Sequence, residues 1–228
     1  MKDVVFGFKI LFYANHYKMS LVTVILAFFA GIVFDAVTLG RNFIGMYYLC
    51  LIPPYLCQLW NSVAVTGILQ SSPKKRSILI TAPVKYYFLL ATIIYAVLCL
   101  LRLFYYSIGH LTETAMFGLA YFGVIMLLLT LYDVIVFRFP EIGYGILFVT
   151  FVVMGFMGGF SIKDSDKLAS FVASVITEIP FIDRRGVLPV IGFVLMIFCT
   201  MFFYGLSKVL YKVPLSTKAY RFSLERQR

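Results

Sequence analysis

The 228-residue chain is apolar and basic: 62% of its residues are hydrophobic, 18% are aromatic, only 13% are charged, and the formal net charge is +10. A soluble domain of this length cannot cover its surface with so few polar residues, so the composition excludes a soluble globular protein. It is typical of a polytopic membrane protein, whose basic residues have to be placed relative to the bilayer before they are interpreted.

The chain begins with an aromatic and basic stretch over residues 1–18. Within it Lys2, Lys9 and His16 recur every seven residues, which places them along one stripe of a helix. A helix with a thin cationic stripe and a broad aromatic face lies in the bilayer interface. We therefore predict an N-terminal interfacial helix here. The alternative is a simple extension of the first membrane span.

Six apolar runs follow, each long enough to cross a bilayer as a helix. They cover residues 19–40, 43–69, 84–107, 115–137, 142–162 and 186–207. Helices of ~20 residues cross a hydrocarbon core of ~30 Å, and continuous apolar runs favour helices over barrel strands. The predicted fold class is therefore all-α, a six-span bundle over residues 19–211 that forms a single permease-like domain with a basic tail at 212–228.

The second run contains prolines and polar residues. Pro53 and Pro54 remove two helix hydrogen bonds, which predicts a kink. Gln58 and Asn61 lie three residues apart and share a helix face, and polar side chains inside a span face protein or water rather than lipid. Hydrogen bonding between helices is the structural alternative for this pair.

A basic loop joins the second and third runs. It reads Ser71, Ser72, Pro73, Lys74, Lys75 and Arg76. Either serine can cap a short helix that has Pro73 in its first turn, and Pro83 predicts another break before the third span. The sequence thus favours a short helix on the membrane surface, while an ordinary positively charged loop remains the alternative.

Charged residues inside the runs lie near their ends rather than at the midplane. Asp35 is near the end of the first run, Arg102 near the far end of the third, and Asp133 in the last turn of the fourth. Arg138 follows at the inner end of the fourth run, and we predict a structural pair between Asp133 and Arg138.

The last part of the bundle has small residues and an amphipathic segment. Gly155, Gly158 and Gly159 in the fifth run allow close approach of two backbones, so they form a predicted dimer contact. Residues 163–185 mix charges with apolar residues spaced three and four apart. This pattern predicts an amphipathic helix on the outer surface that ends before Pro180.

Orientation follows from the basic residues. With the N-terminus inside, 14 of the 20 Lys and Arg lie on the cytoplasmic side and 6 on the outer side. The acidic residues split four inside and six outside, so the whole net charge lies on the inner face. This asymmetry predicts a multi-pass protein with both termini in the cytoplasm. A nucleic-acid partner is not expected, because anionic lipid headgroups attract these cations.

The predicted layout resembles the permease subunits of ABC type-2 exporters. It shares with them an interfacial helix, six spans, a loop between spans two and three with a Ser-Pro and basic sequence (Ser72-Pro73 and the three cations after it), and an outer helix between spans five and six. The similarity covers nearly the whole chain. Chain length and small outer loops look most like bacterial peptide exporters, including the phenol-soluble modulin type.

This resemblance implies roles for particular residues. Ser71 to Arg76 would form the coupling helix that docks into a cleft of a separate ATPase subunit. Spans two and five would line a cavity shared by two permease subunits, either a homodimer or a pair with a sister permease. The cavity residues that it implies are Gln58, Asn61, Phe148, Phe151 and Phe156.

The resemblance also implies the partners and the substrate class. The chain has no phosphate-binding Gly-x-x-x-x-Gly-Lys-Ser/Thr loop, so ATP and Mg²⁺ are expected in the partner ATPase and no cofactor in this chain. The expected cargo is a hydrophobic or amphipathic peptide or drug-like molecule, and the expected location is a bacterial cell membrane.

Other classes are less well supported by the residues. A secondary transporter typically has internal repeats or midplane charges, and a membrane enzyme needs clustered His, Asp, Glu or Cys; the sequence has neither pattern, and no catalytic or metal site is predicted. A secondary transporter, or a membrane scaffold or sensor subunit without an ATPase, is the alternative function.

Overall fold

The computed structural model describes residues 17–41, 43–64, 76–136, 138–163 and 184–212. All regular elements within these ranges are helices. In chain order they are α2 (Tyr17–Val37), α3 (Ile44–Cys50), α4 (Ile52–Ala64), the π-helical η1 (Ser77–Thr81), α6 (Ala82–Ser107), α7 (Glu113–Val136), α8 (Pro140–Lys163) and α10 (Arg184–Leu210). The all-α prediction is confirmed for this part of the chain. The predicted interfacial helix, the outer helix and the basic tail lie almost entirely outside the described residues.

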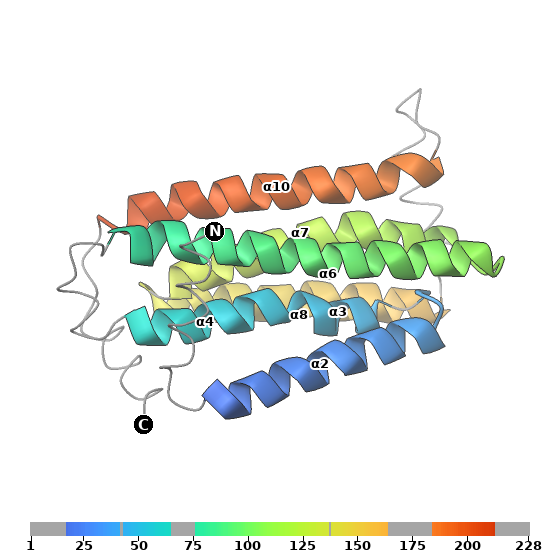
Figure 1. The fold of residues 1–228 in the computed structure, drawn as a ribbon, viewed down its shortest axis with the longest axis horizontal. Coiled ribbons are helices and arrows are strands. Elements are labelled where there is room, and N and C mark those ends of the chain that lie inside the picture. Colours follow the sequence, from blue (N-terminus) through green and yellow to red (C-terminus); the bar gives the residue numbers. More distant parts are fainter. Residues whose placement is uncertain (1–16, 42, 65–75, 137, 164–183, 213–228) are drawn as a thin grey trace.

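The helices lie side by side, with their axes along the longest dimension of the molecule (Figure 1). Four of the described helices are long and apolar enough to cross a membrane: Lys18–Val37, Ser77–Ser107, Ala115–Val136 and Val187–Leu210. Two shorter apolar helices, Ile44–Cys57 and Glu141–Met154, correspond to the second and fifth predicted runs. The protein is therefore a helical membrane protein with at least four helices of spanning length.

Regular α-helical hydrogen bonding in the second run is interrupted at one residue. α3 and α4 meet at Leu51, two residues before Pro53. Helical hydrogen bonds continue across the break, because Leu51 N–H donates to the Tyr47 carbonyl and Tyr55 N–H donates to the Leu51 carbonyl. Pro53 and Pro54 lack the N–H groups that would hold a regular helix here. The kink itself stays a prediction.

Pro83 does not break the third run, which differs from the prediction. The Ala82 N–H donates to the Ser77 carbonyl, five residues back, and η1 continues directly into α6. Pro83 lies in the first turn of α6. A π turn has a wider spacing of hydrogen bonds, which lets a helix pass a proline without ending.

Trp60 satisfies the carbonyl that this π turn leaves without a backbone donor. In the five-residue spacing of η1 the partner of the Ile78 carbonyl would be Pro83, which has no N–H. The indole Nε1–H of the fully buried Trp60 donates to the Ile78 carbonyl instead, at 3.2 Å. The contact fixes the end of α4 against the start of the third run, because a buried carbonyl is costly to leave without a donor.

α7 is the central helix and α2 is peripheral. In its most apolar stretch 61% of the α7 residues are buried, against 17% for α2. α10 and α8 pack on α7, whereas α2 packs mainly on α3. The core around α7 includes Leu119, Phe122, Ile125 and Met126, all buried.

Glycines permit the closest helix crossings. A Cβ atom at Gly192 of α10 would overlap the Leu119 carbonyl oxygen of α7 and lie 2.6 Å from the Tyr95 hydroxyl of α6. A Cβ atom at Gly45 of α3 would lie 2.5 Å from the backbone nitrogen of Asp35 in α2. Two pairs of helices therefore touch backbone to backbone at positions where no larger residue fits.

Candidate functional site

An apolar groove of about 370 Å³ lies between α2, the α3–α4 pair, α7 and α8. Its lining residues are Thr23, Val24, Ala27, Tyr48, Leu51, Ile52, Pro54, Tyr55, Leu129, Tyr132, Leu147 and Phe151. The few polar atoms at its wall are partly engaged: the Thr23 hydroxyl donates to the Met19 carbonyl and the Tyr55 hydroxyl donates to Ser20 Oγ. The groove is therefore suited to apolar atoms rather than to polar or ionic groups.

α2 presents a narrow stripe of small side chains to this groove. Ala27 lies three residues after Val24 and four after Thr23, so these residues share one face of the helix. Leu21, Val22 and Leu26 on the other faces are at least half exposed. Small residues on the inner face leave the groove open, while the large ones suit a lipid-facing surface.

The predicted cavity residues divide between the groove and other positions. Phe151 of α8 lines the groove, whereas Phe148, three residues earlier, is 70% exposed and is not among the lining residues. Gln58 and Asn61 belong to α4 and Phe156 to α8, but their side chains lie outside the described part of the structure. Residues of both the second and the fifth runs therefore line the groove, and Phe151 is the predicted cavity residue among them.

The remaining predicted site residues are described only in part. Gly155, Gly158 and Gly159 belong to α8, and nothing of their surroundings is described. Residues 71–75 of the predicted coupling segment lie outside the described ranges. Arg76, the last residue of that segment, is exposed and directly precedes η1.

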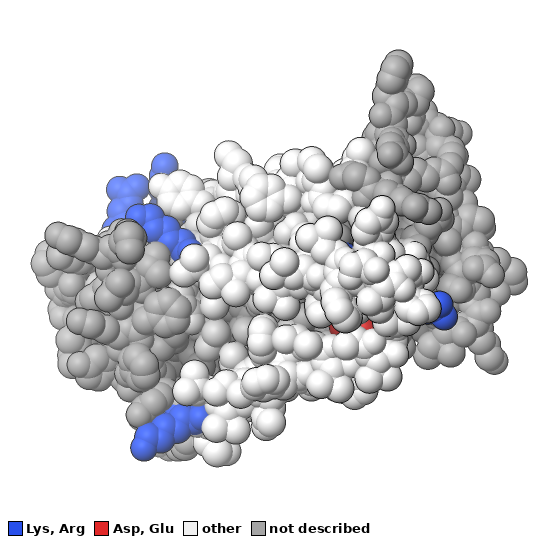
Figure 2. Space-filling model, turned by 45° about the vertical axis from the view of Figure 1, so that its right-hand side comes forward, with Lys and Arg blue, Asp and Glu red and all other residues white. Residues whose placement is uncertain are grey.

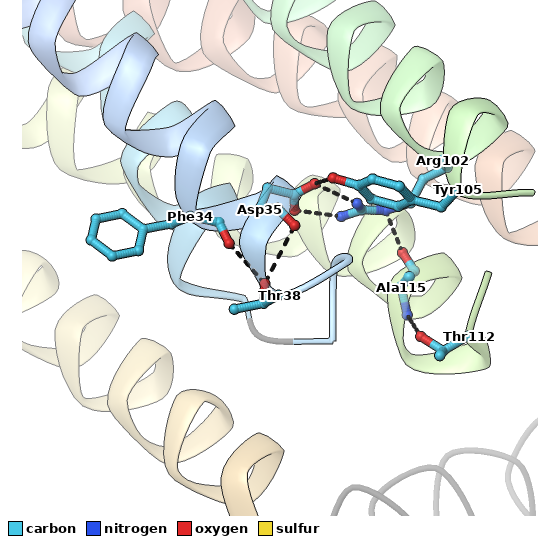
Figure 3. Close-up of polar contacts among 7 residues, drawn as sticks. All are labelled: Phe34, Asp35, Thr38, Arg102, Tyr105, Thr112 and Ala115. Atoms are coloured by element: carbon cyan, nitrogen blue, oxygen red, sulfur yellow. Dashed lines mark hydrogen bonds and ion pairs between the residues drawn. The ribbon is translucent and has the colours of Figure 1, made fainter. Parts of the chain in front are cut away.

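A buried ion pair that the sequence analysis did not predict joins α2 to α6. Asp35 is 0% exposed and Arg102 is 3% exposed. Arg102 Nη1 donates to Asp35 Oδ2 at 2.6 Å and Nη2 donates to Oδ1 at 2.8 Å, a bidentate pair (Figure 3). The Tyr105 hydroxyl donates to Asp35 Oδ2 at 2.9 Å. We call these three residues the charge clasp.

Backbone groups from two further segments complete the surroundings of the clasp. Arg102 Nε donates to the Ala115 carbonyl in the first turn of α7, at 2.9 Å. Thr112 caps that helix, because its hydroxyl accepts from the Ala115 N–H at 3.3 Å. Gly40 has φ +69° in the turn after α2, and a Cβ atom there would overlap the guanidinium of Arg102. Buried charges are tolerated in an apolar bundle when they are paired and hydrogen-bonded in this way.

The sequence contained a signal for this clasp. Asp35 and Arg102 carry opposite charges and lie near the ends of the first and third runs that alternating spans would place on the same side of the membrane. Two opposite charges at the same depth in neighbouring spans are candidates for a buried pair. The capping residue Thr112 and the turn residue Gly40 surround the pair, and both are uncharged.

At the opposite end of the bundle, Asp133 and Arg138 are also buried. Both line a cavity of about 40 Å³ together with Ser207 and Tyr211. The structure therefore brings the two predicted partners to one small cavity between the ends of α7 and α10. A direct ion pair between them stays a prediction.

Exposed basic residues gather at the ends of the bundle, and the broad band between them is mostly uncharged (Figure 2). At the end where α2 begins and α10 ends, the exposed ones are Lys18, Arg76, Lys85, Lys208 and Lys212. Arg41 is exposed at the other end, in the turn that follows α2. This distribution is the one expected of a protein whose middle lies in hydrocarbon.

Comparisons with known proteins assign no family to this chain: no family model matches it, and no curated protein or solved structure matches it. The membrane-length helices, the apolar groove, the charge clasp and the basic end are the features from which a function can be proposed.

Proposed function

We propose that this chain is the permease subunit of an ATP-driven exporter of the ABC type-2 class. Two such subunits form the translocation path, and a separate ATPase subunit supplies the energy. The observation that carries the proposal is the groove in a bundle of membrane-length helices. Residues of both the second and the fifth apolar runs line it, Phe151 among them. Its apolar lining supports a hydrophobic or amphipathic cargo.

The surface of α8 supports a second permease subunit as a partner. Ile142, Phe148, Val149 and Val152 are all exposed, and α8 packs chiefly on α7. A helix that is apolar on its outer face as well can pack on lipid or on another helix. The proposed dimer contact at Gly155, Gly158 and Gly159 lies further along the same helix.

The basic end of the bundle supports the proposed orientation and the site of coupling. Six spans with both termini in the cytoplasm would place Lys18, Arg76 and Lys212 on the inner face of a bacterial cell membrane. Arg76, the last residue of the predicted coupling segment, directly precedes η1 at this end, so an ATPase docked in the cytoplasm would meet it. If that segment were displaced, the hydrogen bond from the Trp60 indole to the Ile78 carbonyl would transmit the displacement to α4.

The coupling segment is tested by replacing Ser72 and Pro73 with Ala together. This change leaves the charge distribution intact but removes the proposed cap and the fixed first turn, and a lost cap costs ~1 kcal/mol. We expect ATPase co-purification to weaken severalfold, or ATP hydrolysis to become independent of export. Labelling of single cysteines placed at positions 75 and 166, from opposite sides of the membrane, checks that the variant inserts normally.

Two results would contradict the proposal. If the wild-type chain co-purifies with no ATPase, a secondary transporter or a scaffold is the better interpretation. If an ATPase does bind but the double Ala variant assembles and exports like the wild type, the segment is an ordinary positively charged loop.

The groove is tested by comparing Phe151→Ala with Phe148→Ala. Both changes remove one aromatic ring from α8, but only Phe151 lines the groove, whereas Phe148 is 70% exposed. Loss of part of an aromatic contact costs ~1 kcal/mol or more. We expect a severalfold higher substrate concentration for half-maximal stimulation of ATPase activity in Phe151→Ala, and a near wild-type value in Phe148→Ala. Equal effects of the two changes would exclude the groove as the substrate path.

A further inference from the structure

The two halves of α2 are held in different ways. The half that ends at Val37 is bound to α6 by the charge clasp through Asp35, which accepts three hydrogen bonds from Arg102 and Tyr105. In the half that begins at Tyr17, the Tyr55 hydroxyl of the neighbouring α4 donates a hydrogen bond to Ser20 Oγ, at 3.4 Å. Charge-assisted bonds in an apolar interior are much stronger than a long bond between neutral hydroxyls.

Backbone packing shows the same difference. A Cβ atom at Gly31 would lie 2.7 Å from Leu49 Cγ, and one at Gly45 would lie 2.6 Å from the Gly31 carbonyl oxygen. α2 and α3 are therefore in close contact along the clasped half of α2. Along the other half, Thr23, Val24 and Ala27 line the groove, and Val24 and Ala27 are only partly buried against the core. Regions with fewer packing contacts open at lower free energy than well-packed ones.

We propose that α2 is a gate that is anchored at one end. The charge clasp and the Gly31–Gly45 crossing hold the outer end, and the end at Ser20 moves toward and away from α8, which narrows and widens the groove. Ser20 lies fifteen residues from Asp35, about 22 Å along a helix with a rise of ~1.5 Å per residue. A tilt of about 10° around the clasp therefore displaces Ser20 by about 4 Å.

Distances between spin labels on the protein in lipid nanodiscs test this proposal. Val22 of α2 and Phe148 of α8 are both exposed, and each is next to a groove-lining residue, so labels there do not fill the groove. Val37 and Tyr106 are exposed near the clasped ends of α2 and α6 and form the matched control pair. Both pairs are introduced as cysteines into a variant whose four native cysteines are replaced by Ala.

We expect the Val22–Phe148 distance distribution to be broader than that of the Val37–Tyr106 pair by about 4 Å, the displacement that a ~10° tilt produces. In a Tyr105→Phe background, which removes one hydrogen bond from Asp35 but keeps the ion pair, the control distribution should broaden as well. The permease is measured alone, without an ATPase, so the result does not depend on the proposed export function.

Two outcomes would overturn the gate. Equally narrow distributions for the two pairs would show that α2 is held as firmly beside the groove as at the clasp. An equally broad distribution for the Val37–Tyr106 pair in the wild-type background would show that the clasp is not an anchor. Both outcomes concern the motion of α2 alone, whereas the export function fails on a different observation, the absence of a bound ATPase.

Discussion

Replacing Asp35 by Ala is expected to destabilise the folded protein by about 3–5 kcal/mol, because the Arg102 guanidinium then stays buried without its carboxylate. The loss also removes the acceptor of the Tyr105 hydroxyl, so one more buried polar group lacks a partner. Free energies of unfolding of the wild type and the variant, measured in the same lipid and denaturant, give the difference directly.

The matched control replaces both charged residues, Asp35→Leu with Arg102→Met. Apolar side chains of similar volume remove the buried charges together, and such replacements are often neutral or even stabilising. The double variant should therefore be more stable than Asp35→Ala alone. A double variant as unstable as the single one would mean that the cost comes from packing around Asp35 and not from an isolated buried charge.

Gly192→Ala is expected to cost about 1–3 kcal/mol, the range for a methyl group forced into a filled core. The new Cβ would overlap the Leu119 carbonyl oxygen, which belongs to backbone and cannot rotate away, and would lie 2.6 Å from the Tyr95 hydroxyl. That hydroxyl donates to the Pro189 carbonyl at 2.5 Å, so its movement would also weaken the contact between α6 and α10.

Gly205→Ala on the same helix is the control. No atom lies within 4 Å of a Cβ built at Gly205. The change should therefore be neutral or stabilise α10 by about 0.4–1 kcal/mol, because it reduces the freedom of the unfolded chain without a clash. Thermal unfolding of both variants separates the two cases, and equal losses for Gly192→Ala and Gly205→Ala would contradict the crossing at Gly192.

The features that the sequence predicts well depend on length and local chemistry. Apolar runs of spanning length predict helices because the backbone must satisfy its own hydrogen bonds in hydrocarbon. Pro53 and Pro54 predict a kink because both lack an N–H group, and in the structure regular helical hydrogen bonding is interrupted beside them, at Leu51. At Pro83 the same rule fails, because the π turn and the Trp60 indole supply what the proline removes.

The features that the sequence does not predict depend on which faces meet. The spans are apolar on all sides, so their periodicity does not show which side is turned inward. For this reason Phe148 and Phe151 look equivalent in the sequence, although both are exposed (70% and 51%) and only Phe151 lines the groove. The Asp35–Arg102 pair joins residues 67 positions apart, and although both lie at similar depths in their runs, that their side chains face each other becomes clear only when the helices are placed side by side.

The buried indole of Trp60 also gives the molecule an optical property. Trp60 is the single tryptophan of the chain, so its fluorescence is not mixed with that of any other indole. It is held against the Ile78 carbonyl at the start of the third run, close to the segment that precedes η1. Indole emission responds to the polarity and hydrogen bonding around the ring. The unlabelled protein therefore contains its own reporter for any event that moves α4 relative to η1.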